Sequence, residues 1–133
     1  MTSRVIYQGG LRTQAEHLQS GAKMITDAPV DNHGKGEAFS PTDTVATALA
    51  TCMLTVMGIK AEAMEIDITG ATASVTKTMA AEPRRISQIE VVIEFKGDFE
   101  EKQKKILENT ARNCPVLYSL HPDIVKNISF HYH

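Results

Sequence analysis

The stretch Ser40-Pro41-Thr42-Asp43-Thr44-Val45-Ala46-Thr47-Ala48-Leu49-Ala50-Thr51-Cys52-Met53-Leu54-Thr55-Val56-Met57-Gly58-Ile59 has the pattern of one long helix. Ser40 is a favourable N-cap, proline suits the first helical position, and Asp43 completes a capping box. Apolar residues then recur at steps of three and four, and no charge follows Asp43 until Lys60. We therefore expect a helix from Pro41 to about Met64 that is buried nearly all round.

Size and composition limit what this helix can belong to. The chain of 133 residues suits one domain spanning residues 1–133. Its net charge of -2 and its dispersed basic residues give no reason to expect nucleic acid as a partner. Tryptophan is absent and aromatic residues make up only 5%, so the core must be aliphatic. A second copy of the chain would help to complete it, and we expect a homodimer.

The compartment follows from what the sequence lacks. The N-terminal residues form no apolar segment of the length that a secretory signal needs. The uncharged run 44–59 is interrupted by threonines and a glycine, and it is shorter than a membrane span. We expect a cytoplasmic protein without a membrane partner. Because that compartment is reducing, its two cysteines are either inert core thiols or redox groups.

The segment before the helix reads as an antiparallel meander. Residues 3–8, 11–17 and 22–26 have strand character, and Gly9-Gly10 and Ser20-Gly21 are turn signals between them. Residues 27–39 form a loop rich in glycine, asparagine and proline, of a length that often shapes a functional site.

The segment after the helix alternates between strand and helix patterns. The predicted elements are a strand over 65–79, a turn over 82–85, a strand over 89–95, a helix opened by a capping box over 98–101, a short helix over 115–120 and a last strand over 128–132. This order predicts an α+β fold in which an antiparallel sheet forms one layer and helices form the other.

The two cysteines lie in different local settings. Cys52 is in mid-helix, where the helix dipole does not reach it. Cys114 precedes Pro115 at an expected helix N-cap, where backbone N–H groups favour a thiolate. An unperturbed thiol is mostly protonated at neutral pH, so a reactive Cys52 needs a desolvated cation, and arginine suits this role because it stays charged when buried.

Arginine candidates for that role are spread along the chain: Arg4, Arg12, Arg84, Arg85 and Arg112. Arg12 lies on a strand that can cross the helix, and the Asp43 carboxylate can hold such an arginine in place. A plainer interpretation stays open, in which both cysteines fill the core, Asp43 only caps the helix and Arg12 is a surface residue. His131 and His133 share a strand face but have no third ligand, and we expect neither a metal nor a cofactor.

Three segments resemble the OsmC/Ohr family, the osmotically inducible protein C and organic hydroperoxide resistance proteins. The segment 39–52, which ends at Cys52, is similar to the family's cysteine-bearing helix. Cys114-Pro115-Val116 resembles its second cysteine motif, and the loop 31–39 resembles the glycine-rich segment before the helix. The likeness, with matching element order, covers essentially the whole chain.

The resemblance implies an α+β sandwich in an intertwined homodimer, and a cysteine-based hydroperoxide reductase. Cys52 would be the peroxidatic nucleophile that becomes a sulfenic acid, and Cys114 would resolve it as a disulfide. An external dithiol, from a small molecule or a lipoyl or thioredoxin-type protein, would reduce that disulfide. Arg12 would stabilise the thiolate, and Asp43 would hold the arginine.

The chain also departs from the family pattern. Peroxidase members carry a glutamate directly after the motif proline, and this chain has Thr42 there; Asp43, one residue on, matches the more divergent OsmC-like branch. The serine of the second motif is displaced to Ser119. These departures leave an alternative function open, in which the dimer binds a small apolar or thiol-reactive molecule between its subunits.

Overall fold

The computed structural model describes residues 1–133. The chain divides into two compact units, Met1–Val45 and Ala46–His133. The boundary falls near the start of the long helix α1 (Pro41–Ala63), which agrees with the helix predicted from Pro41 to about Met64.

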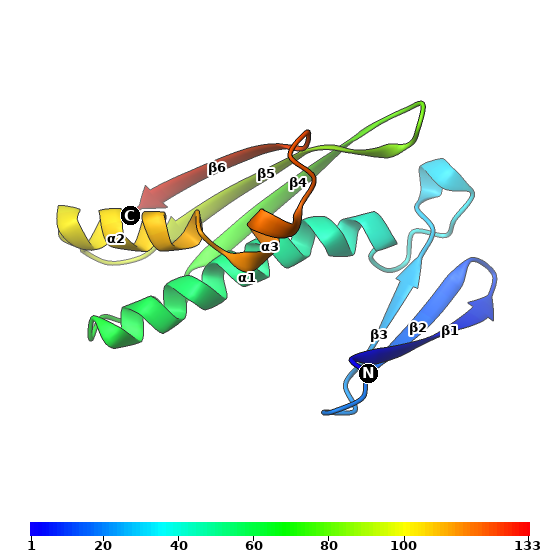
Figure 1. The fold of residues 1–133 in the computed structure, drawn as a ribbon, viewed down its shortest axis with the longest axis horizontal. Helices are drawn as coiled ribbons and strands as arrows, with labels where there is room; N and C mark the ends of the chain where they lie inside the picture. Colours follow the sequence, from blue (N-terminus) through cyan, green and yellow to red (C-terminus); the bar gives the residue numbers. More distant parts are fainter. The chain divides into compact units, whose positions relative to one another are not determined.

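The N-terminal unit contains an antiparallel sheet of three strands. Its strands are β1 (Ser3–Gly9), β2 (Arg12–His17) and β3 (Lys23–Asp27), paired in the order β1-β2-β3. The predicted meander is therefore confirmed (Figure 1). A short 3-10 helix, η1 (Val30–Asn32), lies inside the segment that was predicted to be a loop.

This unit buries almost no apolar side chain. All of β1 is exposed, and Val5, Ile6 and Tyr7 are each more than half accessible. The buried residues of the unit are polar: Thr26, Asp27 and Ser40. The sheet thus has apolar side chains but, within the single chain, no apolar core of its own.

The C-terminal unit contains a second sheet with helices on one side. Its strands are β4 (Thr72–Ala80), β5 (Arg85–Phe95) and β6 (Val125–Tyr132), and its further helices are α2 (Glu101–Ala111) and α3 (Pro115–Ser119). Strand order is β4-β5-β6. Figure 1 shows α1 and α2 on the same side of this sheet.

The prediction of antiparallel pairing holds for β4 and β5 but is wrong for β6, which pairs parallel to β5. The reason is the connection: α2 and α3 form a crossover from the end of β5 back to the start of β6, as a parallel pair requires. The sheet is therefore mixed, and its central strand β5 has a partner of each orientation.

The core of the C-terminal unit lies between this sheet and the helices. The predicted alternation along β5 is confirmed, because Ile89, Val91, Ile93 and Phe95 are all fully buried while Glu90 and Glu94 are exposed. From α1 and α2 the core receives the following buried residues: Leu49, Met53, Met57, Leu107 and Ala111.

Helix α1 is buried on one side only. Leu49, Met53 and Met57 are inaccessible, whereas Thr51 and Ile59 are exposed. The expectation of burial nearly all round is thus wrong for the single chain, because one sheet covers one face of a helix. The helix is also long and apolar enough to span a membrane, with a mean hydropathy of 1.5, but core helices of soluble proteins share that property and it is weak evidence.

Several predicted boundaries move, and β5 and β6 start at Arg85 and Val125 rather than at residues 89 and 128. β4 starts at Thr72 rather than at residue 65, because residues 64–71 leave α1 through turns in which Ile66 N–H still bonds the Ala61 carbonyl. The capping box of α2 pairs Glu100 with Gln103 rather than residues 98 and 101. Phe99 instead packs edge-on against Phe95, which fixes how the chain enters the helix.

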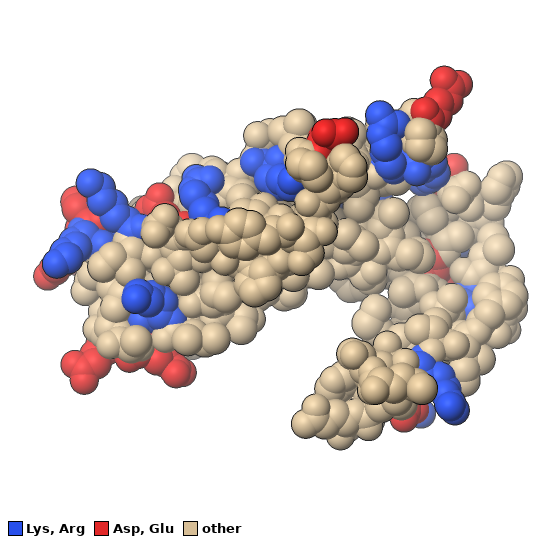
Figure 2. All heavy atoms as spheres, in the orientation of Figure 1, with Lys and Arg blue, Asp and Glu red and all other residues tan.

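Charged side chains are mixed in sign over the surface seen in Figure 2. Basic and acidic residues lie side by side around the start of α2, and no large area of this face carries a single sign. This distribution agrees with the dispersed basic residues and the net charge of -2.

Candidate functional site

The start of α1 is built by the capping box predicted from the sequence. The Ser40 hydroxyl accepts a hydrogen bond from the Asp43 N–H at 3.0 Å, and the Asp43 carboxylate accepts one from the Ser40 N–H at 3.0 Å. Ser40 is almost fully buried. This reciprocal pair satisfies two backbone donors that a helix start leaves open, and it orients the first turn of the helix that carries Cys52.

Cys52 lies three turns into α1 and is partly buried. Its neighbour Met53 points into the core, so Cys52 lies at the edge of the packed face. It forms no disulfide. A thiol in this position is held by a rigid helix and still has access to the surface.

Cys114 lies where the sequence placed it, at the N-cap of α3. Its backbone is extended, Pro115 follows at the first helical position, and its sulfur accepts a hydrogen bond from the Leu117 N–H at 3.4 Å. Unlike Cys52 it is completely buried. The two thiols therefore differ in access although both belong to the C-terminal unit.

The environment of Cys114 favours its thiol over its thiolate. Burial raises the pKa of Cys114, and the Leu117 N–H lowers it by less. Hydrogen bonding and charge from Cys52 raise the pKa further, so the two thiols are close enough to interact. The sequence indicated a thiolate favoured by the helix start; burial outweighs that effect because a charged sulfur loses its hydration.

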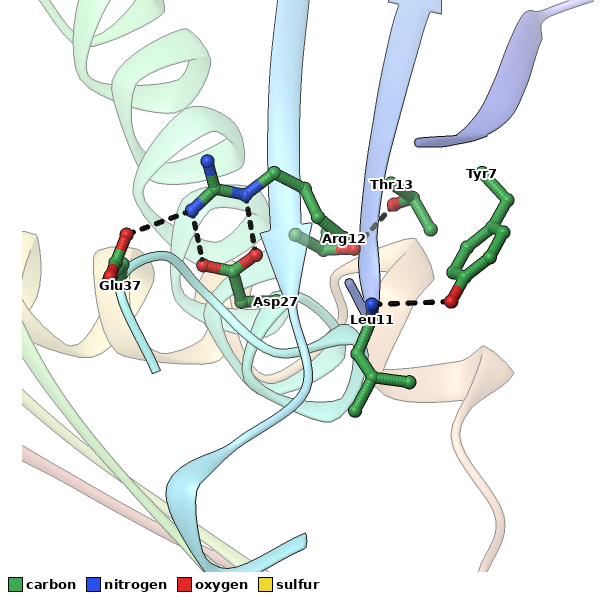
Figure 3. A network of polar contacts seen from close by, with 7 residues as sticks. Tyr7, Leu11, Arg12, Thr13, Asp27 and Glu37 are labelled. Atoms are coloured by element: carbon green, nitrogen blue, oxygen red, sulfur yellow. Dashed lines mark hydrogen bonds and ion pairs between the residues drawn. The ribbon is translucent and has the colours of Figure 1, made fainter. Parts of the chain in front are cut away.

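Arg12 is fixed by two carboxylates of the N-terminal unit (Figure 3). Its Nε donates to Asp27 Oδ1 at 2.7 Å and its Nη2 to Asp27 Oδ2 at 2.8 Å, a bidentate pair. Nη2 also donates to Glu37 Oε2 at 3.2 Å. Arg12 and Asp27 are opposite each other in the β2–β3 ladder, which explains their direct approach.

The electrostatics of this pair favour charge on both partners. The guanidinium of Arg12 lowers the pKa of Asp27 through hydrogen bonding, against the opposing effect of burial. Asp27 in turn raises the pKa of Arg12, with a smaller contribution from Glu37. The Asp27 side chain is only 1% exposed and that of Arg12 is 30% exposed, so the ion pair is shielded from water on its acidic side.

The predicted site residues thus fall into two groups. Cys52 and Cys114 come together in the C-terminal unit, while Arg12 and Asp43 belong to the N-terminal unit. The role of Asp43 as an arginine anchor stays a prediction. Asp27 and Glu37 were missed, although counting residues across the predicted hairpins would have put Asp27 opposite Arg12.

The C-terminal unit, which contains both cysteines, also has an open groove. It has a volume of about 610 Å³ and is lined by Val56, Ile59, Lys60, Ala63, Asn109, Thr110 and Asn113. The α1 residues of this set follow Cys52 at helical spacing, so they share its face of the helix. No group of three or more His, Cys, Asp or Glu side chains is arranged to hold a metal ion.

Comparison with solved structures shows close relatives of this fold. A protein of Psychrobacter arcticus 273-4, described as an osmotic stress induced and detoxification response protein, is 60% identical over 98% of this chain and 96% of its own, with a TM-score of 0.96. An OsmC-like protein of Mycoplasma pneumoniae is 18% identical over 98% of this chain and 96% of its own, with a TM-score of 0.81.

A third structure, the organic hydroperoxide resistance protein OsmC of Legionella pneumophila, is 17% identical over 98% of this chain and 97% of its own, with a TM-score of 0.72. No curated protein matches the chain at a significant level. The family described as OsmC-like protein matches residues 34–129, which include α1 and both cysteines. The chain therefore belongs to the OsmC-like protein family, as its two cysteine motifs indicated.

Proposed function

We propose that this protein is a stress-response thiol peroxidase that reduces organic hydroperoxides. The observation that carries the proposal is the pair of interacting thiols in the C-terminal unit, Cys52 and Cys114: Cys52 is partly accessible, whereas Cys114 is buried and burial raises its pKa. Family membership supports it, as do the descriptions of relatives as a detoxification response protein and an organic hydroperoxide resistance protein.

In this proposal Cys52 attacks first, because it is the thiol with access to the surface. Its thiolate sulfur bonds the outer peroxide oxygen, the O–O bond breaks, and the alkoxide takes a proton and leaves as the alcohol. Cys52 is thereby oxidised to a sulfenic acid, and the hydroperoxide is reduced by two electrons. Arg12 stabilises the thiolate, and Asp43 serves the same arginine as a further carboxylate beside Asp27 and Glu37.

Cys114 then resolves the sulfenic acid. While Cys52 is a thiolate, its charge raises the pKa of Cys114; oxidation to a neutral sulfenic acid removes that effect, and the Leu117 N–H still favours the Cys114 thiolate. The Cys114 sulfur forms a disulfide with Cys52 and water leaves. A dithiol, supplied by a small molecule or by a lipoyl or thioredoxin-type protein, reduces the disulfide and restores both thiols.

The proposal includes a cytoplasmic homodimer. It is supported by the exposed apolar side chains of the β1–β3 sheet, notably Val5, Ile6 and Tyr7, and by the exposed Ile59 on α1. Burial of such side chains is the usual source of association energy. Sedimentation at micromolar concentration should give the mass of two chains, and a monomer would count against this part of the proposal.

The decisive experiment is peroxide consumption with a dithiol reductant. Wild-type protein should consume cumene hydroperoxide, and Cys52→Ser should lose this activity. Cys114→Ser is the matched control: it should form a sulfenic acid that dimedone traps on Cys52, but no disulfide. If Cys52→Ser consumes the peroxide as fast as the wild type, the proposal is wrong.

A second candidate function is non-enzymatic binding of a small apolar or thiol-reactive molecule. The groove lined by Val56, Ile59 and Ala63 favours it, because it is apolar along the α1 face that carries Cys52. In that case a thiol-reactive compound should modify Cys52 once without turnover, and hydroperoxide should not be consumed. Mass spectrometry of the protein after one equivalent of hydroperoxide separates the two functions, since only the peroxidase yields a Cys52–Cys114 disulfide.

A further inference from the structure

Helix α3 is too short to be stable by itself. It has five residues, Pro115–Ser119, whereas isolated helices shorter than about 12 residues are marginal in water. Its inner side chains, Val116 and Leu117, are partly buried against the core of the C-terminal unit. Contacts from outside the helix must therefore hold it in place, and with it the buried thiol of Cys114 at its N-cap.

The link between α2 and α3 supplies a second set of contacts (Figure 1). Asn113 lies in this link, directly before Cys114. Its Nδ2 donates to the Asn109 carbonyl at 2.7 Å, and its Oδ1 accepts a hydrogen bond from the Tyr118 hydroxyl. One amide side chain thus bonds the last turns of α2 with one polar atom and the last turn of α3 with the other, across the position of Cys114.

Tyr118 contributes to the fold mainly through this hydrogen bond. The residue is 71% exposed, so its ring adds little to the core. Because water competes for an exposed hydroxyl, the net effect of such a bond is modest, on the order of a twofold to tenfold change in an equilibrium constant. That is enough to shift the balance between a closed and an open position of a helix with only five residues.

The position of α3 determines the surroundings of the Cys114 sulfur. Sγ accepts a hydrogen bond from the Leu117 N–H at 3.4 Å, and Leu117 directly precedes Tyr118 on α3. If α3 moved away from the end of α2, the sulfur would lose its burial beside the core. The arrangement in which Cys114 interacts with Cys52 therefore depends on the contact between the two helices.

We propose that Asn113 and Tyr118 are positioning residues that clamp α3 to α2, keep the Cys114 thiol out of solvent and hold it toward Cys52. This role rests on the proposed function, in which Cys114 resolves the sulfenic acid of Cys52. The clamp acts on that second step only, since the attack of Cys52 on the hydroperoxide does not use it. A loosened clamp exposes Cys114 more often and leaves it less often in the position from which the disulfide forms.

The first measurement is the alkylation of Cys114 in full-length Cys52→Ser protein, where it is the only thiol. Iodoacetamide reacts with a fully buried thiol only after local opening, and mass spectrometry follows the rate. Tyr118→Phe removes the hydroxyl and keeps the ring, so it should speed alkylation by about twofold to tenfold. An unchanged rate would overturn the inference.

A double-mutant cycle separates the clamp from a general loosening of α3. In an Asn113→Ala background, Tyr118→Phe should change the alkylation rate by less than about twofold, because the hydroxyl has already lost its partner. Ser119→Ala is the matched control: its hydroxyl bonds the Pro115 carbonyl inside α3 and does not hold α3 to α2, so the rate should stay unchanged. An equal effect of Tyr118→Phe with and without Asn113, or faster alkylation in Ser119→Ala, would overturn the clamp.

The second measurement uses protein with both cysteines and one equivalent of cumene hydroperoxide. Tyr118→Phe should form the Cys52 sulfenic acid at the wild-type rate, but it should form the Cys52–Cys114 disulfide about twofold to tenfold more slowly. A general loss of stability would not divide the two steps in this way. Equal slowing of both steps, or disulfide formation at the wild-type rate, would contradict the positioning role.

Failure of the proposed function is recognised separately. If wild-type Cys52 does not react with hydroperoxide, the peroxidase proposal fails, and faster alkylation of Cys114 in Tyr118→Phe would still support the clamp. If Cys52 reacts but the wild type forms no disulfide, the resolving role of Cys114 fails and the inference is overturned with it, while the first step of the peroxidase stands.

Discussion

The two sheets of this protein have three strands each but opposite packing. In β4–β6, every second residue of the central strand β5 from Ile89 to Phe95 is buried against the helices. In β1–β3, no apolar residue is buried, and the inaccessible side chains are the polar ones of Thr26 and Asp27. The β4–β6 sheet is stabilised by burial of apolar side chains. Within the single chain, the β1–β3 sheet is stabilised by the backbone hydrogen bonds between its strands and by the Arg12–Asp27 ion pair.

This difference explains where each kind of group is placed. The thiols, which need a rigid and partly dry setting, belong to the unit with an apolar core. Arg12 belongs to the sheet without an apolar core. There the buried carboxylate of Asp27 fixes the position of the Arg12 side chain in place of apolar packing. An ion pair with a buried partner is sensitive to loss of either side chain, whereas a packed core is sensitive to loss of volume.

The largest expected effect comes from truncating the packed core. Leu49→Ala removes a side chain that is 0% exposed, and it should lower the free energy of unfolding by about 2–5 kcal/mol. Leu18→Ala is the same change in the other unit at a residue that is 41% exposed, and it should cost less than about 1 kcal/mol. Urea unfolding followed by circular dichroism measures both; equal losses would contradict the contrast between the units.

Two glycines should respond in opposite directions to alanine. At Gly34 the added Cβ meets the Ala28 carbonyl oxygen, so Gly34→Ala should destabilise the N-terminal loop by about 1–3 kcal/mol. At Gly58, within α1, the Cβ meets nothing within 4 Å, so Gly58→Ala should stabilise the helix by up to about 1 kcal/mol. Thermal unfolding of the two variants beside the wild type checks both signs, and a stabilising Gly34→Ala would refute the loop geometry.

Acid should weaken the N-terminal sheet first. The pKa of Asp27 is lower in the folded chain than in the unfolded one, so its contribution to stability is present above the unfolded carboxyl value of about 3.9 and is lost as pH falls through the folded value. NMR spectra recorded from pH 6 down to about pH 2 should show the amides of β2 and β3 changing before those of β5. In Asp27→Asn this acid-dependent step should be absent.

Alkali should act on the other unit, with the smallest effect of the series. Burial raises the pKa of Cys114 in the folded chain. The contribution of this thiol to the stability of the fold is therefore present below the pKa of an unfolded thiol, about 8.5, and is lost as pH rises through the pKa of the folded state. Denaturant unfolding between about pH 7 and pH 10 should show a decline in stability that Cys114→Ser reduces. An identical decline in both proteins would show that another group, such as Tyr132 with its raised pKa, causes it.

Much of the local structure could be predicted from the sequence, because its signals act over a few residues. The capping box of Ser40 and Asp43, the alternation from Ile89 to Phe95 and the proline after Cys114 each specify an element by themselves. The same motifs sufficed to recognise the family, which the match over residues 34–129 confirmed.

Only the tertiary structure determined which distant residues come into contact and which are removed from solvent by burial. The parallel pairing of β6 with β5, the contact of Glu37 with Arg12, and the raised pKa of Cys114 all depend on how distant parts of the chain pack together. Local periodicity carries no information on such contacts, because pairing and desolvation are set by residues tens of positions away. For Cys114 this reversed the prediction: the helix start favours its thiolate, but complete burial favours its thiol.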